Sequence, residues 1–390
     1  MPDLPPKDSP DIHLVVATPE ELIQQTHANS TEWRGSLSVE AYQRREKHLL
    51  DQVLTRDGGL TPWMLVYQPS SGNGSRLVLC GCESIKKKAL VARAGGEVED
   101  VIAHGVASVF CPPKHRGKGY ASRLMEEVGK RLRTWQDQGT QKTLFSVLYS
   151  DIGKDFYAAR GWQPFPSAHI SLRAEAVPEQ PAVKVELLEA EDLPELCAID
   201  ERLLRKRLSK MGDQSKTRVA IVPEIATLQW HHAREDFVTT ELYHKTAEIK
   251  GAMVGSEPGK RLWCYWTRVW ANPQEESGNT LHILRLVVED DTFSDFLPAF
   301  EASNADAGNP ELKTAIAALF AAAQAEAVRW DMKTVQIWSP TSTTLAAARL
   351  LDHDASVIHR ESESIASMRW YGEGSWQDVD WVCNEKYGWC

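Results

Sequence analysis

A strand, a glycine-bearing turn and an amphipathic helix follow one another between residues 101 and 135. Residues 101–111 predict a short strand, and residues 121–135 predict a helix because apolar residues recur there at helical spacing. Four of these apolar side chains share one helix face: Leu124, Val128, Leu132 and Trp135. A helix that begins directly after a tight turn presents unpaired backbone N–H groups and the positive end of its dipole. This junction therefore predicts an α/β fold with an anion site, suited to a pyrophosphate.

The residues of the turn support the same interpretation. Gly117 and Gly119 lack a Cβ atom, so the main chain can approach phosphate oxygens closely. Ala121 keeps the next position small, and Arg116 and Lys118 add positive charge to a chain whose net charge is -10. We therefore expect a local basic site on an acidic protein.

Two well-known phosphate loops do not match this turn. A P-loop requires Gly at the position of Pro112 and Ser or Thr at the position of Gly119. A dinucleotide fingerprint requires a third Gly where Ser122 stands, and it also needs a parallel βαβ sheet around it. The turn belongs to neither class.

The remaining pattern, Arg-x-x-Gly-x-Ala, is formed by Arg116, Gly119 and Ala121 between a strand and a helix. It resembles the cofactor loop of the GNAT superfamily of N-acetyltransferases. The resemblance implies that acetyl-coenzyme A is the cofactor and that it contacts seven loop residues: Arg116, Gly117, Lys118, Gly119, Tyr120, Ala121 and Ser122. It also implies that the preceding strand splays from its neighbour and pairs with the pantetheine arm through the main chain of three residues: Val109, Phe110 and Cys111.

A second segment, residues 156–162, resembles the Tyr-x-x-x-Gly-[Phe/Trp] motif that follows the fifth strand in that superfamily. The resemblance implies that Tyr157 is the general acid for the departing thiolate. A phenol with an ordinary pKa of about 10 is protonated at neutral pH and can donate that proton. A tyrosine packed in the core beside Phe156 and Trp162 is the alternative interpretation.

The general base is less clearly indicated. His104 lies on the predicted cofactor strand and is our candidate, with Asp100 and Glu99 as alternatives. The alternation of strand side chains leaves open which face of the sheet His104 occupies. Two positions where relatives often carry a base are occupied here by Gly105 and Ala107. A backbone N–H of the splayed strand is the expected partner of the oxyanion.

After a proline-bearing segment at residues 174–181, the same order of elements begins again. Strands are predicted at residues 183–188, 247–255, 261–269, 281–288, 333–338 and 365–371, with helices from residue 190 and at residues 310–330 and 342–351. The predicted fold class is α/β, of the α+β type with mixed sheets. A GNAT domain is expected at residues 1–175 and a degenerate GNAT-like domain at residues 182–390.

The second half has no glycine loop between its strand at residue 281 and its helix at residue 310. Residues 289–295 are acidic there and would repel a pyrophosphate. We therefore expect a copy without cofactor that completes the amine pocket or supports the core. His231 and His232 are adjacent on a predicted helix and do not share a face, so surface or packing roles are expected rather than joint binding of a metal.

Within the superfamily, the chain resembles the fungal lysine N6-acetyltransferase-like proteins. The segments that carry this resemblance are residues 45–49, 105–121, 149–157 and 385–390. It implies acetyl transfer from acetyl-coenzyme A to a small primary amine such as lysine, by direct attack in a ternary complex. Acetylation of a protein or peptide amine, and coenzyme binding without turnover, are the alternatives.

The composition of the chain limits the classes of partner and the location that are expected. Acidic residues outnumber basic ones by 54 to 44, which argues against nucleic acid as the main partner. The apolar runs are too short to span a membrane, and the first residues do not form a secretory signal, so a cytoplasmic location is expected. The seven scattered cysteines predict reduced thiols and no metal site. Oligomeric state is not indicated.

Overall fold

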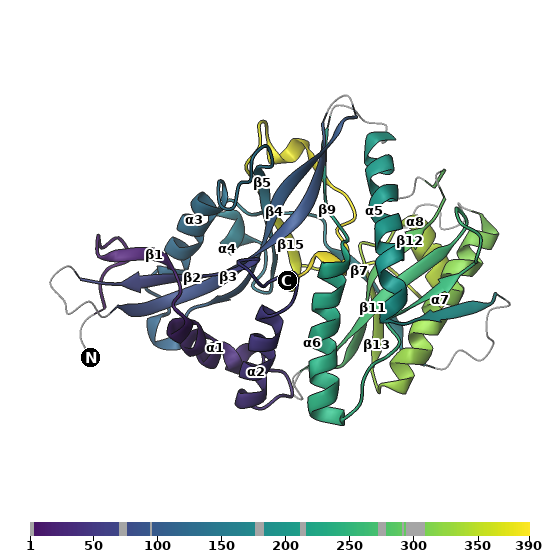
Figure 1. Cartoon of the computed structure of the whole chain (residues 1–390), viewed down its shortest axis with the longest axis horizontal. Coiled ribbons are helices and arrows are strands. Elements are labelled where there is room, and N and C mark those ends of the chain that lie inside the picture. Colours follow the sequence, from purple (N-terminus) through teal and green to yellow (C-terminus); the bar gives the residue numbers. More distant parts are fainter. Residues whose placement is uncertain are drawn as a thin grey trace.

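Two mixed β-sheets stand side by side in the computed structural model, with helices packed over them (Figure 1). The structure describes residues 4–69, 76–93, 96–175, 183–210, 216–271, 278–290, 292–293 and 309–390. The predicted α/β class with mixed sheets is confirmed. The proline-bearing segment at residues 174–181 lies largely outside the described residues.

The first sheet has the strand order β1-β2-β3-β4-β5-β15-β6, with β9 paired to β3 and β16 paired to β9. Its strands are β1 (Ile12–Val16), β2 (Leu60–Tyr67), β3 (Leu77–Ala92), β4 (Val98–Phe110), β5 (Thr143–Ser150), β6 (Gln163–Pro164), β9 (Thr217–Ile221), β15 (Ile365–Trp370) and β16 (Val379–Trp381). The helices of this half are α1 (Pro19–Trp33), α2 (Val39–Leu50), α3 (Tyr120–Leu132) and α4 (Asp155–Ala158), with the 3-10 turn η1 (Pro113–His115). The predicted strand before the glycine turn and the predicted helix after it are both present.

The second sheet has the order β14-β7-β13-β12-β11-β10-β8. Its strands are β7 (Ala168–Arg173), β8 (Val185–Leu188), β10 (Gly251–Val254), β11 (Leu262–Val269), β12 (Thr280–Val288), β13 (Thr334–Trp338) and β14 (Ile358–His359). The helical elements are η2 (Ala190–Asp192), α5 (Leu193–Lys210), α6 (Ile225–Tyr243), α7 (Pro310–Arg329), α8 (Ser342–Ala348), η3 (Trp376–Asp378) and η4 (Lys386–Gly388). The parallel pair β12–β13 repeats the parallel pair β4–β5. The predicted repetition of element order is therefore present in space.

The two sheets exchange strands across the predicted domain boundary. β7 precedes residue 175, yet it pairs with β13 of the second sheet, with Ile170 opposite Ile337. β15 lies near the other end of the chain, yet it pairs with β5 of the first sheet, with Ala366 opposite Tyr149. The sheets therefore do not divide between residues 175 and 182, because each is completed by a strand from the other half of the sequence.

One hydrophobic cluster joins the two sheets. The ring of Tyr149 on β5 lies 5.7 Å from that of Trp338 on β13 and 6.0 Å from that of Trp381 on β16. Val147 of the first sheet and Tyr265 of the second are buried in the same cluster. Burial of aromatic surface on this scale is a main source of folding free energy, so the halves stabilise each other.

The two helices before the first hairpin are fixed by side-chain caps. Thr18 accepts a hydrogen bond from the Glu21 amide, and the Glu21 carboxylate accepts one from the Thr18 amide, which forms a capping box. Ser38 caps α2. α2 ends at Leu50, and beyond it the Thr55 hydroxyl donates to backbone carbonyls of Leu49 and Gln52.

The adjacent histidines of α6 have separate packing roles. His231 and His232 are both buried, and their Nε2 atoms lie 3.1 Å and 3.0 Å from the carbonyl oxygens of Tyr387 and Trp266. Burial lowers the pKa of His232 to about 4, so the ring is neutral at physiological pH. Of the surface and packing roles expected for this pair, the structure shows packing.

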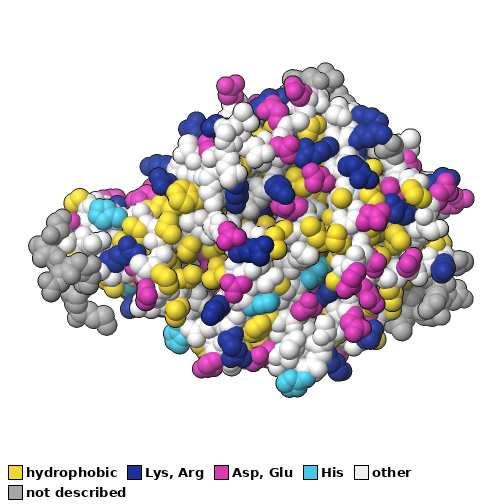
Figure 2. Space-filling view, viewed as in Figure 1, with side chains coloured by type: hydrophobic (Ala, Val, Ile, Leu, Met, Phe, Trp, Pro, Cys, Tyr) yellow, Lys and Arg dark blue, Asp and Glu magenta, His cyan; other side chains and the backbone are white. Residues whose placement is uncertain are grey.

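The surface carries mixed charge. Figure 2 shows acidic and basic side chains interspersed over the face that includes both halves. In the described part of the chain, no helix combines the length and apolarity that a membrane span requires. No cluster of three or more His, Cys, Asp or Glu side chains is placed there to bind a metal.

The strand exchange predicts that residues 1–175 do not fold alone. Such a fragment lacks β9, β15 and β16, so it leaves an edge of β5 unpaired and opens the shared hydrophobic cluster. We expect a weak near-ultraviolet circular dichroism signal, dye binding to exposed apolar surface and no cooperative melting. The full chain is the control, and a sharp melting transition of the fragment would contradict the prediction.

Candidate functional site

The parallel strands β4 and β5 separate after a short paired stretch. Their pairing runs from Ile102 opposite Thr143 to Gly105 opposite Val147, and both strands continue beyond it without pairing to each other. This confirms the splay that the family resemblance implied. Backbone N–H and C=O groups on the facing edges are left free to pair with a ligand.

A β-bulge lies in the splayed part of β4. Gly81 and Glu83 of β3 pair with Phe110 and Ala107 of β4, so two residues of β4 stand opposite one residue of β3. One of the two, Ser108, has a φ of 53°, in the left-handed region that non-glycine residues seldom occupy. Bulges of this kind re-aim side chains beside active sites.

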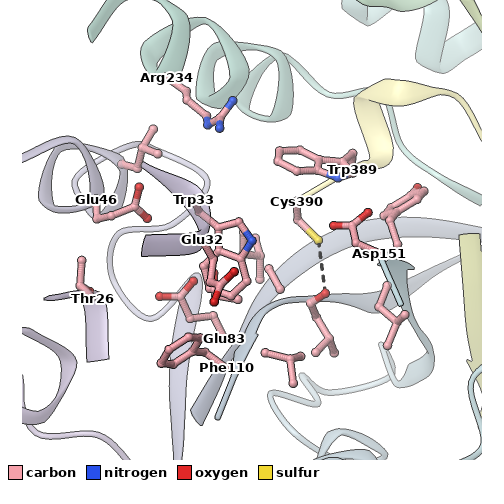
Figure 3. Close-up of a pocket in the computed structure, with 18 of the residues that line it drawn as sticks. Thr26, Glu32, Trp33, Glu46, Glu83, Phe110, Asp151, Arg234, Trp389 and Cys390 are labelled. Carbon is pink, nitrogen blue, oxygen red and sulfur yellow. Dashed lines mark hydrogen bonds between the residues drawn. The ribbon is translucent and has the colours of Figure 1, made fainter. Parts of the chain in front are cut away.

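A cavity of about 730 Å³ opens at the splay, within the size range of small-molecule sites. Its first wall is the splayed part of β4, at residues 106–110, with α1 and α2 beside it. The second half supplies Trp230 and Arg234 from α6, and the residues Trp389 and Cys390 also line it (Figure 3). The cavity is therefore shared by the two halves of the chain.

The glycine turn leads from β4 into α3. Gly117 and Gly119 have φ values of 76° and 81°, which glycine adopts without the steric cost of a Cβ atom. The buried His115 anchors the turn, because its Nδ1 lies 2.8 Å from the carbonyl oxygen of Leu79. α3 begins at Tyr120 without a side-chain cap, so its first N–H groups point out of the helix end.

The predicted cofactor residues occupy three kinds of position. Five of them line the cavity: Val109, Phe110, Cys111, Arg116 and Ala121. Gly117, Lys118 and Gly119 form the turn beside it. The side chains of Tyr120 and Ser122 are directed elsewhere, since Tyr120 donates to the Pro5 carbonyl and Ser122 accepts from Arg160 at 2.6 Å. Those two residues can offer a ligand only their backbone.

Arg116 braces the turn against the strand. Its Nε donates to the Cys111 carbonyl at 2.9 Å, and its guanidinium lies 5.8 Å from the centre of the Phe110 ring. It also forms an exposed ion pair with Glu32 at 3.3 Å. Such pairs are weak in water, so this arginine can still attract an anion to the turn.

Tyr157 of α4 lines the same cavity and is 8% exposed. Its ring packs edge-on against Phe156, 5.0 Å away. Burial raises the pKa of Tyr157 above its ordinary value, so the phenol is protonated at neutral pH. In the described structure no hydrogen-bond partner engages its hydroxyl, which leaves the proton available.

His104 does not reach the cavity. It is fully buried, and its Nε2 lies 3.0 Å from the side-chain oxygen of Gln136. Burial lowers the pKa of His104 to about 4. The alternatives are also elsewhere: Asp100 pairs with Arg205 and Glu99 pairs with Arg93, both at the surface. The structure therefore brings none of the proton acceptors named from the sequence to the cavity.

A different carboxylate lines the cavity instead. Glu83 projects from β3 beside the bulge, and Figure 3 shows it near Phe110. Burial and the nearby negative charge of Glu46 raise the pKa of Glu83 to about 7, although a hydrogen bond with Ser108 opposes the shift. Sequence reasoning missed this residue. The available signal was a lone carboxylate within the apolar strand of residues 77–85.

In the second half, the corresponding gap between β12 and β13 is occupied by the chain itself. Glu385 accepts a hydrogen bond from the Leu286 amide at 3.0 Å, and Asn384 accepts one from the Ser339 hydroxyl at 2.5 Å. The cavity that remains there is about 50 Å³, far smaller than a typical ligand site. Of the predicted acidic loop, Glu289 pairs with Arg261 at 2.6 Å, and part of the loop lies outside the described residues.

Comparison with known proteins agrees with this architecture. A family model described as the LYC1 GNAT-like C-terminal domain matches residues 169–390 and so begins within β7. A lysine acetyltransferase of Yarrowia lipolytica is 22% identical over 293 residues, which cover 65% of this chain and 72% of that protein.

Two solved structures share the fold. A GCN5-related N-acetyltransferase from Anabaena variabilis has a TM-score of 0.52 and 14% identity, covering 93% of this chain and 73% of that one. A probable N-acyltransferase from Enterococcus faecalis has a TM-score of 0.51 and 16% identity, covering 92% and 72%. The family model matches more than half of this chain, and the chain therefore belongs to the LYC1-like family of GNAT acetyltransferases.

Proposed function

We propose that this chain is an N-acetyltransferase that moves an acetyl group from acetyl-coenzyme A to a primary amine of a small molecule, such as the N6 amine of lysine. The observation that carries the proposal is one cavity that joins a splayed strand pair, a glycine turn and an ionisable carboxylate. The name of the Yarrowia relative supports lysine as the acceptor.

The cofactor's acidic groups have a suitable partner in the glycine turn. A Cβ atom built on Gly117 would meet no atom within 4 Å, so the space outside the turn is open to a ligand. The N–H groups at the start of α3 and the charge of Arg116 favour a pyrophosphate there. The unpaired edge of β4 at residues 106–110 then receives the pantetheine arm, and the coenzyme supplies an acyl group activated as a thioester.

Two side chains perform the proton transfers. Glu83 accepts a proton from the substrate ammonium, which frees the nitrogen lone pair to attack the thioester carbonyl. A backbone N–H of the splayed part of β4 stabilises the oxyanion. As the carbon–sulfur bond breaks, Tyr157 donates its proton to the thiolate, and the second proton lost by the attacking nitrogen restores the Tyr157 phenol. The products are the acetylated amine and free coenzyme A.

The shape of the acceptor side favours a small amine over a polypeptide. α2 packs against α6 of the second half, and Trp230, Arg234 and Trp389 lie over the cavity. These elements enclose the space that faces Glu83, whereas a polypeptide acceptor needs a continuous groove. The second half thereby completes the amine pocket.

The proposed cofactor site predicts a selective effect of Gly117→Ala. The φ of 76° at this position is strained for alanine, at a cost of about 1–2 kcal/mol. We expect coenzyme A affinity, measured by calorimetric titration, to fall by about tenfold. Gly374→Ala is the matched control, because Gly374 has a φ of 79°, equally open surroundings and no place in the cavity. Equal coenzyme affinities of the two variants would exclude a role of the turn.

The proposed base predicts a pH profile. A base acts only when ionised, so kcat/KM for lysine should rise with pH and level off above about 7, the value to which the pKa of Glu83 is raised. Glu83→Gln should lower kcat by about 100-fold or more and abolish that rise. Measurement of kcat/KM from pH 5.5 to 9 tests both statements.

Stability provides an independent check of the Glu83 pKa. A carboxyl whose pKa is raised on folding binds more protons in the folded state, so its contribution to stability is lost as pH rises through the folded value of about 7. Glu83→Gln should therefore be more stable than the wild type at pH 8. A glutamine variant that is inactive because it fails to fold would give the opposite result.

The proposed acid predicts that Tyr157→Phe slows turnover without weakening coenzyme binding. Removing the hydroxyl deletes the proton donor but preserves the packing against Phe156. We expect kcat to fall by about 10- to 100-fold, with an unchanged dissociation constant for coenzyme A. An unchanged kcat would remove Tyr157 from the mechanism, and coenzyme binding by the wild type without transfer to any amine would favour the non-catalytic alternative.

A further inference from the structure

The acceptor side of the cavity contains two arginines with different surroundings. Arg45 of α2 is buried and donates from Nε and Nη2 to the Glu46 carboxylate at 2.8 Å and 2.6 Å. A third hydrogen bond joins it to the Trp33 carbonyl at 3.3 Å. The charges of Arg45 and Glu46 are therefore paired with each other.

Arg234 of α6 has no such partner. It lines the cavity, and Figure 3 shows its guanidinium pointing into the open space. Among the described residues, no carboxylate or carbonyl hydrogen-bonds to this group, and its Cζ lies 5.6 Å from the centre of the Trp389 ring. Burial and the repulsion of Arg45 lower the pKa of Arg234 to about 10, although the charge of Glu46 opposes the shift, so the group remains charged at neutral pH.

A partly buried cation without a counter-ion is costly for a folded protein. A ligand that supplies the missing anion offsets this cost. A guanidinium offers parallel N–H donors whose geometry matches a carboxylate or a phosphate. The residues around Arg234 indicate which of these two anions it binds.

The position of Arg234 in the cavity favours a carboxylate as its ligand. The phosphates of the coenzyme belong at the glycine turn between β4 and α3, whereas Arg234 projects from α6 beside Trp230 and Trp389. Figure 3 shows it across the cavity from Phe110 of β4 and from Glu83. Arg234 and Glu83 thus form a basic and an acidic end of the cavity; in Figure 3 the side chain of Trp33 lies between them, and that of Trp389 lies beside Arg234.

We infer that Arg234 binds the carboxylate of an amino-acid acceptor whose reacting amine lies at the Glu83 end. This inference rests on the proposed function, and it narrows the acceptor to a free amino acid that carries an amine at the end of an aliphatic side chain. The aromatic side chains of Trp33 and Trp389 can cover the methylene groups of the acceptor's aliphatic side chain. A lysine residue within a polypeptide has no free carboxylate at this position and lacks the group that Arg234 recognises.

The inference is tested by comparing three acceptors of similar length: lysine, lysinamide and 1,5-diaminopentane. Only lysine carries the carboxylate. For the wild type we expect kcat/KM with lysine to exceed that with lysinamide by about 10- to 100-fold, as for a hydrogen-bonded ion pair. Arg234→Gln should lower kcat/KM with lysine by a similar factor, mainly through KM, and should change the value with lysinamide little.

Two further variants sharpen the test. Arg234→Lys keeps the charge but loses the forked geometry, so it should retain part of the preference for lysine. Arg44→Gln is the matched control, because Arg44 is an exposed arginine of α2 that pairs with Glu241 and does not line the cavity. It should behave as the wild type with all three acceptors. Coenzyme A affinity should be unchanged in Arg234→Gln, and its melting temperature should equal or exceed that of the wild type, because the variant no longer buries an unpaired cation.

Two results would overturn the inference: equal use of lysine and lysinamide by the wild type, or an equal loss with both acceptors in Arg234→Gln. Failure of the proposed function gives a different pattern, namely coenzyme binding with no acetyl transfer to any of the three amines. In that case, calorimetric titration of lysine and lysinamide into the wild type and Arg234→Gln still decides the inference. Binding of lysine that depends on Arg234 supports it, and identical titrations overturn it.

Discussion

Strands β4 and β5 stop pairing after Gly105 and Val147, and the backbone groups beyond that point need other partners. The other main features of the site follow from this separation. The splay opens the cavity, and the bulge at Ser108 turns β4 away from its neighbour while leaving Glu83 at the edge of the opening. The glycine turn then continues from the free end of β4. A fully paired β4 would close the space in which two substrates can meet.

The second half shows the other solution to the same backbone requirement. β12 and β13 also separate, but Glu385 and Asn384 supply hydrogen bonds to that gap from the chain itself. Arg285 secures this segment through Glu385 and pairs with the buried Asp200 at 2.8 Å. A gap filled in this way contributes stability rather than binding, so the duplicated fold retains one open splay. The filling segment leads directly to Trp389, which lines the cavity of the first half.

Sequence reasoning succeeded where the signal was local. The glycine turn and the helix after it depend on neighbouring residues, and both were predicted in place. Prediction from the sequence failed for features that depend on contacts between distant segments. The pairing of β7 with β13 depends on residues far apart in the chain, and no periodicity reveals which sheet a strand joins. The face occupied by His104 was similarly undetermined. The pKa of Glu83 is raised by burial and by the charge of Glu46 on α2, and both depend on segments that are distant in the sequence.

The charges of the cavity also bear on the order of events. In the free protein, burial and Glu46 favour the protonated form of Glu83, which cannot act as a base. An amino acid held by Arg234 would bring its ammonium group toward Glu83, and a nearby positive charge favours the ionised carboxylate. Under the proposed mechanism, the substrate therefore lowers the pKa of Glu83 as it binds. Near neutral pH the empty pocket therefore holds much of the carboxyl in its protonated form, and the arriving amine favours the ionised form that acts as a base. This arrangement reduces the cost of burying an unpaired charge.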